Sequence, residues 1–260
     1  MGKISIQDFY NIRGRRALEK KQISLGSDQY PEYLKTPYLY VEKVLEDETN
    51  NQAKTTRYAL ELCCGTGLDA LRLVQLGYKV EALDVSEFSI KAAKRFSEQL
   101  QLSNEVNYRL ANVNQALVFP DSHFNLIYIS GALYYLDQDS IYYEIRRVIA
   151  KHGLFCFIET NGDAFLLSVW RRLKNFFAKH RDHQTLTGLL REKDIIRFKA
   201  VFPGAQVRYF DFLTLFGVLF SRTPMLVRFW CKLTRPIDDF LLNGLGLHFL
   251  AFKFVIHGRE

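Results

Sequence analysis

Short apolar runs alternate with longer amphipathic segments over most of the chain from residue 57 onward. We expect strands at Tyr58–Leu62, Val80–Leu83, Val106–Ala111, Phe124–Ser130 and Leu154–Ile158. We expect helices at Leu68–Gln75, at Glu87–Leu102 with Ser86 as its N-cap, and at Ser140–Ala150. Short apolar strands separated by helices predict right-handed crossovers and a parallel sheet covered on both faces. The pattern therefore indicates an α/β fold with an open, doubly wound sheet.

The chain before residue 57 has a different character. Residues 1–56 are mainly polar with helical spacing, and the run NNQAKTT at their end is typical of a linker. We therefore expect two parts, an N-terminal helical segment at 1–56 and a domain at 57–260.

Composition narrows the class of protein. Of the 260 residues, 48% are apolar and 24% are charged, as in soluble globular proteins. The four cysteines have neither the density of a disulfide scaffold nor zinc-ligand spacing, which favours reduced thiols and a cytoplasmic location. The first residues lack the apolar run of a signal peptide, and no stretch of roughly 18 apolar residues predicts a membrane-spanning helix.

The charge of the chain points to no particular partner. A net charge of +7 spread over 35 basic and 28 acidic residues is typical of a solvated surface. Nucleic-acid binding would place basic residues among exposed aromatics on one element, and no such motif occurs. Asp137 and Asp139 lack a third ligand, and acids at a helix start are usually caps, so we expect no metal site.

The stretch ELCCGTG ends the first expected strand and begins a turn. Gly65 and Gly67 allow a sharp reversal and let a ligand approach bare backbone. In a doubly wound sheet, ligands bind beyond the carboxyl ends of the strands, where this turn lies. GTGLDA also fits the dinucleotide pattern G-x-G-x-x-A, with Asp84 at the end of the second strand. The turn alone does not decide whether the ligand is a dinucleotide or another molecule.

Glu61 separates these two interpretations. An acid inside an apolar strand is costly to bury unless a partner compensates for it. A pyrophosphate in the turn would be repelled by this carboxylate, whereas a ligand with an amino group and a sulfonium would be attracted. S-adenosylmethionine is such a ligand. The alternative is that Glu61 only accepts hydrogen bonds from loop amides.

Four stretches, in order, resemble class I S-adenosylmethionine-dependent methyltransferases over about residues 58 to 161. ELCCGTG is similar to motif I, an acid and an apolar residue before GxGxG, and EALDVSEFSI resembles the motif that follows it. LANVNQALVFPDSHFNLIYISGALYYL and AKHGLFCFIETN are similar to the stretches around the fourth and fifth strands. Three residues depart from the family pattern: Cys63 replaces a glycine, and Asn112 and Asn125 stand where acids are common.

The resemblance implies S-adenosylmethionine as cofactor and a site for it. It assigns Glu61, Gly65 and Gly67 to the methionine moiety with Cys63 in the same turn, Asp84 to the ribose, Val85, Asn112 and Val113 to the adenine, and Ser130 to the surroundings of the methyl group. Val85 and Val113 would equally suit an ordinary core. The family's sheet has seven strands, mostly parallel, with the last inserted antiparallel. Gln206–Phe212 and Leu250–His257 fit the two remaining places.

The acceptor side is less defined by the sequence. Methyl transfer by in-line displacement needs mainly orientation, and a hydroxyl acceptor also needs a base. His183 in KHRDHQTLT is our candidate base, although a plain loop histidine fits the same pattern. Tyr134 and Tyr135 follow the fourth strand and are expected to line the acceptor pocket. We expect the acceptor group to be a hydroxyl of a small molecule, a glycan or a lipid-linked intermediate. The sequence does not indicate an oligomeric state.

The C-terminal part contains unusually apolar segments, and its tail resembles that of bacterial methyltransferase-domain proteins. We expect a helical insertion at about 163–200 and 213–247 that packs as a cap over the acceptor site. The alternative is that residues 170–181 and 213–233 lie on the inner face of the membrane, since aromatic residues beside Arg and Lys suit an interfacial helix.

Two other functions compete with methyl transfer. An NAD(P)-dependent oxidoreductase would use the same glycine turn, but the chain has no Tyr-x-x-x-Lys pair. A non-catalytic protein that binds S-adenosylmethionine is the second alternative, and only turnover would distinguish it.

Overall fold

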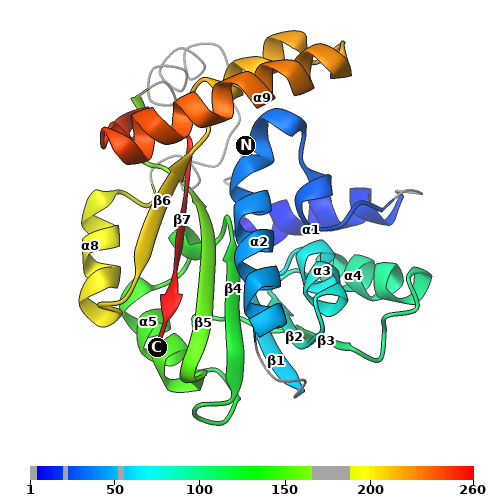
Figure 1. The fold of residues 1–260 in the computed structure, drawn as a ribbon. Helices are drawn as coiled ribbons and strands as arrows, with labels where there is room; N and C mark the ends of the chain where they lie inside the picture. The colour runs from blue at the N-terminus through cyan, green and yellow to red at the C-terminus, as the bar shows by residue number, and fades with distance from the viewer. Residues whose placement is uncertain (1–4, 20–22, 52–55, 166–187) are drawn as a thin grey trace.

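The computed structural model describes residues 5–19, 23–51, 56–165 and 188–260, and within them a seven-stranded sheet forms the centre (Figure 1). Its strands are β1 (Arg57–Leu62), β2 (Tyr78–Asp84), β3 (Val106–Leu110), β4 (Phe124–Ser130), β5 (Ile149–Thr160), β6 (Gln206–Phe210) and β7 (Lys253–Arg259). The order is β3-β2-β1-β4-β5-β7-β6. The β1 to β5 pairs are parallel, and β7 is antiparallel to both β5 and β6. The predicted fold class, with its antiparallel last strand, is confirmed.

Helices cover both faces of the sheet (Figure 1). One layer consists of α2 (Thr36–Asn51), α3 (Leu68–Gln75) and α4 (Glu87–Gln99), with α1 (Ile6–Leu18) packed on α4. The other layer consists of α5 (Gln138–Val148) and α8 (Glu192–Val201). Because side chains alternate along a strand, β1 contributes Leu60 and Leu62 to the α5 side and Ala59 to the α2 side.

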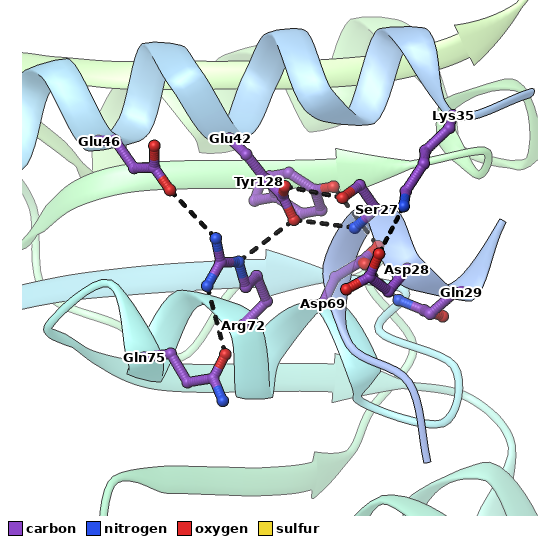
Figure 2. A network of polar contacts seen from close by, with 10 residues as sticks. All are labelled: Ser27, Asp28, Gln29, Lys35, Glu42, Glu46, Asp69, Arg72, Gln75 and Tyr128. Atoms are coloured by element: carbon purple, nitrogen blue, oxygen red, sulfur yellow. Dashed lines mark hydrogen bonds and ion pairs between the residues drawn. The ribbon is translucent and has the colours of Figure 1, made fainter. Parts of the chain in front are cut away.

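The N-terminal segment shares its core with the sheet. Tyr38, Val41 and Leu45 of α2 are buried in the same cluster as residues of β1, β2 and β4. Arg72 of α3 forms ion pairs with two glutamates of α2, at 3.2 Å to Glu42 and 3.1 Å to Glu46 (Figure 2). These contacts fix α2 against α3, beside the turn that follows β1.

Most element boundaries differ from the sequence-based prediction by a few residues, and two of the larger differences have a backbone reason. The helix expected to reach Leu102 ends at Gln99, because Gln101 adopts a left-handed φ of 57°. The strand expected from Leu154 begins at Ile149, which pairs with Phe124 of β4. The register then shifts, so the chain between Ile149 and Leu154 bulges. A propensity pattern does not reveal such a bulge.

The C-terminal part forms helices between β6 and β7. It comprises η4 (Thr214–Phe220), α9 (Pro224–Asp239), the π-helical η5 (Phe240–Gly244) and η6 (His248–Leu250). The Asp238 carboxylate accepts hydrogen bonds from the backbone N–H groups of residues 212, 213 and 214 at 2.8–3.0 Å. This holds α9 across the carboxyl end of β6 (Figure 1). None of the described helices is both long and apolar enough to cross a bilayer.

Candidate functional site

A cavity of about 1120 Å³ lies at the carboxyl ends of β1, β2 and β4. Its walls bring together most of the residues singled out from the sequence, namely Glu61, Cys63, Gly65, Asp84, Val85, Asn112, Val113, Ser130 and Tyr135. Helix α1 supplies a further wall through Tyr10, Arg13 and Arg16, which the sequence did not mark. Gln7 donates a hydrogen bond to the carbonyl of Val85 at 3.2 Å, which links α1 to the end of β2.

The turn after β1 is tight and partly left-handed. The φ angles of Cys63, Gly65 and Gly67 are 59°, 53° and 71°. The Cys64 N–H donates to the carbonyl of Leu83 at 2.9 Å, which holds the turn against β2. Cys63 therefore takes a conformation that costs an L-residue about 1–2 kcal/mol. The departure from the family pattern at this position is accommodated by backbone strain.

The two glycines of the turn meet different surroundings. A Cβ added to Gly65 would have no atom within 4 Å, since the residue faces the open cavity. A Cβ on Gly67 would lie 2.6 Å from the ring of Tyr108 and 2.8 Å from Ala93. Gly67 is the N-cap of α3 and does not line the cavity. Gly65 thus exposes backbone to a ligand, and Gly67 permits close packing.

Glu61 lies on β1 with only 2% of its surface exposed. Burial first, and then the nearby carboxyls of Asp69 and Asp84, raise its pKa well above the usual value. A hydrogen bond from the Ala70 backbone N–H opposes this rise only in part, and Oε2 has no hydrogen-bond partner among the described residues. The bond from Ala70 agrees with the alternative that Glu61 only accepts hydrogen bonds from backbone amides. The second carboxyl oxygen of Glu61, however, has no hydrogen-bond partner among the described residues. A cationic group in the cavity would stabilise the ionised form of this carboxyl.

Asp84 joins two turns at the end of β2. Its Oδ2 accepts a hydrogen bond from the Gly65 N–H at 2.8 Å, and its Oδ1 accepts one from the Ser86 N–H at 2.8 Å. Burial raises the pKa of this carboxyl, and the backbone amides of Ser86, Gly65 and Val85 counteract the rise. Ser86 caps α4 as expected, accepting from the Ser89 N–H at 3.1 Å. Asp84 therefore supports the shape of the site besides lining it.

Asp69 is an acid of the site that the sequence analysis missed. It lies in the first turn of α3, where an acid usually serves the helix N-terminus. Its Oδ1 accepts from Gln29 at 2.7 Å and its Oδ2 from the Tyr128 hydroxyl at 3.4 Å (Figure 2). Burial raises its pKa to about 6. Its closeness to Glu61 makes this part of the cavity acidic.

A second polar group lies at the start of β7. The Lys253 ammonium lines the cavity and donates to the Tyr38 hydroxyl at 3.0 Å, and the ring of Tyr30 stacks on Tyr38 at 3.6 Å between centroids. Burial lowers the pKa of Lys253, but Tyr38, Glu159 and Asp211 together outweigh it and leave the pKa raised. These residues come from four distant parts of the chain, so no local motif could reveal them.

The predicted acceptor residues are only partly placed. Tyr135 lines the cavity, and its ring meets that of Tyr10 edge-on at 5.9 Å. Tyr134 packs beside Tyr135 at 4.1 Å between centroids but is not among the lining residues. His183 and the basic segment 170–181 lie outside the described residues. Within the described chain, no three acidic, His or Cys side chains are grouped so as to hold a metal ion.

Known proteins similar to this chain are methyltransferases. Residues 59–153 match the family described as a methyltransferase domain. A demethylmenaquinone methyltransferase of Leptospira interrogans is 32% identical over 112 residues, 42% of this chain and 45% of that protein. A sterol 24-C-methyltransferase of Aspergillus fumigatus is 30% identical over 98 residues, 37% of this chain and 26% of that protein. The chain thus aligns with less than half the length of either relative.

Solved structures extend the likeness to the whole fold. A geranyl diphosphate C-methyltransferase from Streptomyces coelicolor, solved with Mg²⁺, geranyl-S-thiolodiphosphate and S-adenosyl-L-homocysteine, superimposes with a TM-score of 0.59. The match covers 94% of this chain and 84% of that one at 13% identity. The match to the methyltransferase family over residues 59–153 agrees with the resemblance drawn from the sequence motifs, and the solved structure confirms the expected fold.

Proposed function

We propose that this chain, whose residues 59–153 match a methyltransferase domain, is an S-adenosylmethionine-dependent methyltransferase that acts on a small molecule. The observation that carries the proposal is the unpaired Oε2 of Glu61, a buried residue that lines the same cavity as Gly65. A cofactor with an ammonium and a sulfonium compensates that carboxylate. A pyrophosphate at the same turn would be repelled by the carboxylates of Glu61, Asp69 and Asp84.

The remaining residues of the cavity suit the other parts of this cofactor. Each Asp84 oxygen accepts one backbone amide and keeps a lone pair with which to accept a ribose hydroxyl. Asn112 uses its carbonyl oxygen to accept from the Asn114 N–H at 3.1 Å, which leaves its NH₂ group to donate to an adenine nitrogen. Val85 and Val113 provide apolar contacts for the base. Ser130, at the end of β4, is our candidate for the methyl end.

The acceptor is proposed to occupy the part of the cavity near Tyr30, Tyr38 and Lys253. Two aromatic rings provide an apolar wall there, and the ammonium and hydroxyl provide donors for an oxygen of the acceptor. The relatives are named for a quinone precursor, a sterol and a prenyl diphosphate, all small molecules with extended apolar parts. We propose an acceptor of that kind. A glycan or a lipid-linked intermediate is the alternative acceptor.

The cofactor supplies a methyl group on a leaving sulfur, so the protein's contribution is mainly orientation and exclusion of water. Helix α1 and Tyr135 close one side of the cavity, and the turn at Gly65 fixes another. A hydroxyl acceptor would transfer its proton to a base. His183 stays our candidate for that role.

Ligand binding tests the cofactor. At about 100 times its dissociation constant, S-adenosylhomocysteine should stabilise the fold by about 2.7 kcal/mol, and NAD and NADP should not. A thermal shift with NADP alone would favour the oxidoreductase instead. Transfer of label from methyl-labelled S-adenosylmethionine to a quinol or a prenyl diphosphate would exclude a non-catalytic binding protein.

A further inference from the structure

The outward side of α9 is apolar, whereas the outward side of a surface helix is usually polar. Met225, Phe229 and Phe240 are 78%, 67% and 61% exposed. Leu226, Leu233 and Ile237 are also exposed. The helical spacing of about four residues places these six side chains along one stripe, which runs along α9 and ends at Phe240, the first residue of η5. The opposite side carries the buried residues Val227, Cys231, Thr234 and Asp238. Helix α9 therefore satisfies its packing on one side and presents a second apolar side to solvent.

The neighbouring η4 enlarges this surface. Its residues Phe216, Val218 and Leu219 are exposed, Leu219 by 74%. The indole of Trp230 in α9 donates to the carbonyl of Leu213 at 2.9 Å, and its ring contacts Phe220 at 5.6 Å, so the two elements form one unit. We call the exposed apolar side chains of η4 and α9 the α9 face. Contiguous exposed apolar surfaces of this kind mark sites of interaction.

The charges beside the α9 face have one sign. Arg222, Arg228 and Lys232 are exposed, and none forms an ion pair with another described residue. The acids of α9 are engaged elsewhere: Asp238 accepts from backbone amides, and Asp239 pairs with Arg208 at 2.7 Å. An unpaired basic rim around apolar side chains suits an anionic lipid surface. A second copy of the same face would bring like charges together.

We propose that the α9 face docks on an anionic lipid bilayer, with its apolar side chains in the headgroup region and its three basic residues on lipid phosphates. The docking does not depend on the proposed methyl transfer. The benefit of docking for catalysis rests on the proposed function. The Arg235 guanidinium of α9 bonds Glu32 at 2.6 Å, and Glu32 lies two residues after Tyr30, which lines the cavity. The bilayer would thus lie near the end of the cavity assigned to an apolar acceptor.

Vesicle flotation of the full chain tests this surface. The probes are vesicles of phosphatidylcholine alone and of equal parts phosphatidylcholine and phosphatidylglycerol, at low and high salt. We expect binding to the anionic vesicles that salt weakens. Replacing Arg228 and Lys232 by Gln should lower the partition coefficient by about fivefold per charge. Phe229→Ser with Leu233→Ser should lower it by about tenfold or more.

Helix α8 offers a matched control, because it also carries exposed apolar and basic residues. Ile196→Ser and Lys199→Gln should leave vesicle binding unchanged. The proposal is overturned if the protein does not float with anionic vesicles at low salt. Equal losses in the α8 and α9 variants would also overturn it, as would a dimer that Phe229→Ser dissociates. Thermal shift with S-adenosylhomocysteine, measured on the same variants, reports separately on the proposed function.

Discussion

The carboxylate of Asp84 accepts a hydrogen bond from the Gly65 N–H at 2.8 Å and so ties the end of β2 to the glycine turn after β1. Its other oxygen accepts from the Ser86 N–H, which begins α4. One side chain therefore fixes the relative positions of two turns that line the cavity. Any ligand that uses Asp84 meets a carboxylate already held in place by the backbone, so little side-chain entropy is lost on binding.

Asp84→Ala is expected to reduce both stability and cofactor affinity. Each backbone amide left unpaired when buried costs about 1–3 kcal/mol, and Asp84 satisfies two. Asp84→Asn keeps one acceptor oxygen and should give a smaller loss of both. Urea unfolding and calorimetric titration with S-adenosylhomocysteine measure the two effects. An Asp84→Ala protein with unchanged affinity would remove Asp84 from the proposed cofactor site.

Gly65→Ala and Gly67→Ala should separate ligand contact from packing. Both residues have positive φ, so each alanine carries a backbone cost of about 1–2 kcal/mol. The new methyl at 65 meets open cavity, so stability should fall little further while cofactor binding weakens. The methyl at 67 meets Tyr108 and Ala93, so the loss of stability should be clearly larger. Melting curves with and without ligand give both quantities, and equal melting temperatures for the two variants would contradict this assignment.

Cofactor binding is expected to release a proton. The raised pKa of Glu61 means that the free protein holds this proton to a higher pH than an ordinary glutamate. A cationic ligand favours the ionised carboxyl and lowers its pKa. Affinity should therefore rise with pH between the bound and free pKa values. Titration calorimetry in two buffers of different ionisation enthalpy measures the proton directly.

Glu61→Gln should abolish this release and weaken binding. Asp69, with a pKa raised to about 6, is the other acid of the site that could supply the proton, so Asp69→Asn is the matched control. Proton release that persists in Glu61→Gln and vanishes in Asp69→Asn would assign the proton to Asp69.

Glu159 should make stability fall as pH rises. Burial raises its folded pKa to about 7, above the unfolded value of about 4.3. Below about pH 4.3 both states hold the proton, so the contribution to stability is at its maximum and does not change with pH. Between the two pKa values only the folded state holds it, so its contribution to stability declines until about pH 7. Glu159→Gln keeps an oxygen for the N–H groups of Ala132 and Leu133, which Oε1 accepts at 3.0 and 2.7 Å.

Urea unfolding between pH 5 and 8 measures this slope. The variant should show a shallower decline than the parent protein by about 1–3 kcal/mol across the range. If stability falls equally with pH in the two proteins, the pKa of Glu159 is not raised on folding. The charge of Lys253, which lowers the pKa of Glu159, would then offset the effect of burial.

The local sequence was sufficient where a short segment decides its own structure. Leu68–Gln75 is a helix with the predicted ends, because a left-handed glycine starts it and an amphipathic spacing continues it. Phe124–Ser130 is a strand with the predicted ends, because seven residues rich in apolar side chains suit a strand buried on both faces. The turn of ELCCGTG indicated the ligand end of the sheet for the same local reason.

Other features depend on residues that meet only in the folded chain. The cavity wall contributed by α1 and the pair of Tyr38 and Lys253 each join segments far apart in sequence. The closeness of Asp69 to Glu61 depends on how the turn between β1 and α3 folds. Their charges and exposure depend on burial and on neighbours, which a linear pattern does not specify. The apolar character of 213–233 was evident from the sequence, whereas its division into a buried and an exposed side was not. The sequence thus determined the order of the elements and the position of the glycine turn, because these follow from local periodicity and backbone conformation. Which side chains share the cavity and which side of α9 faces water are set by long-range packing against the sheet, so a local pattern does not specify them.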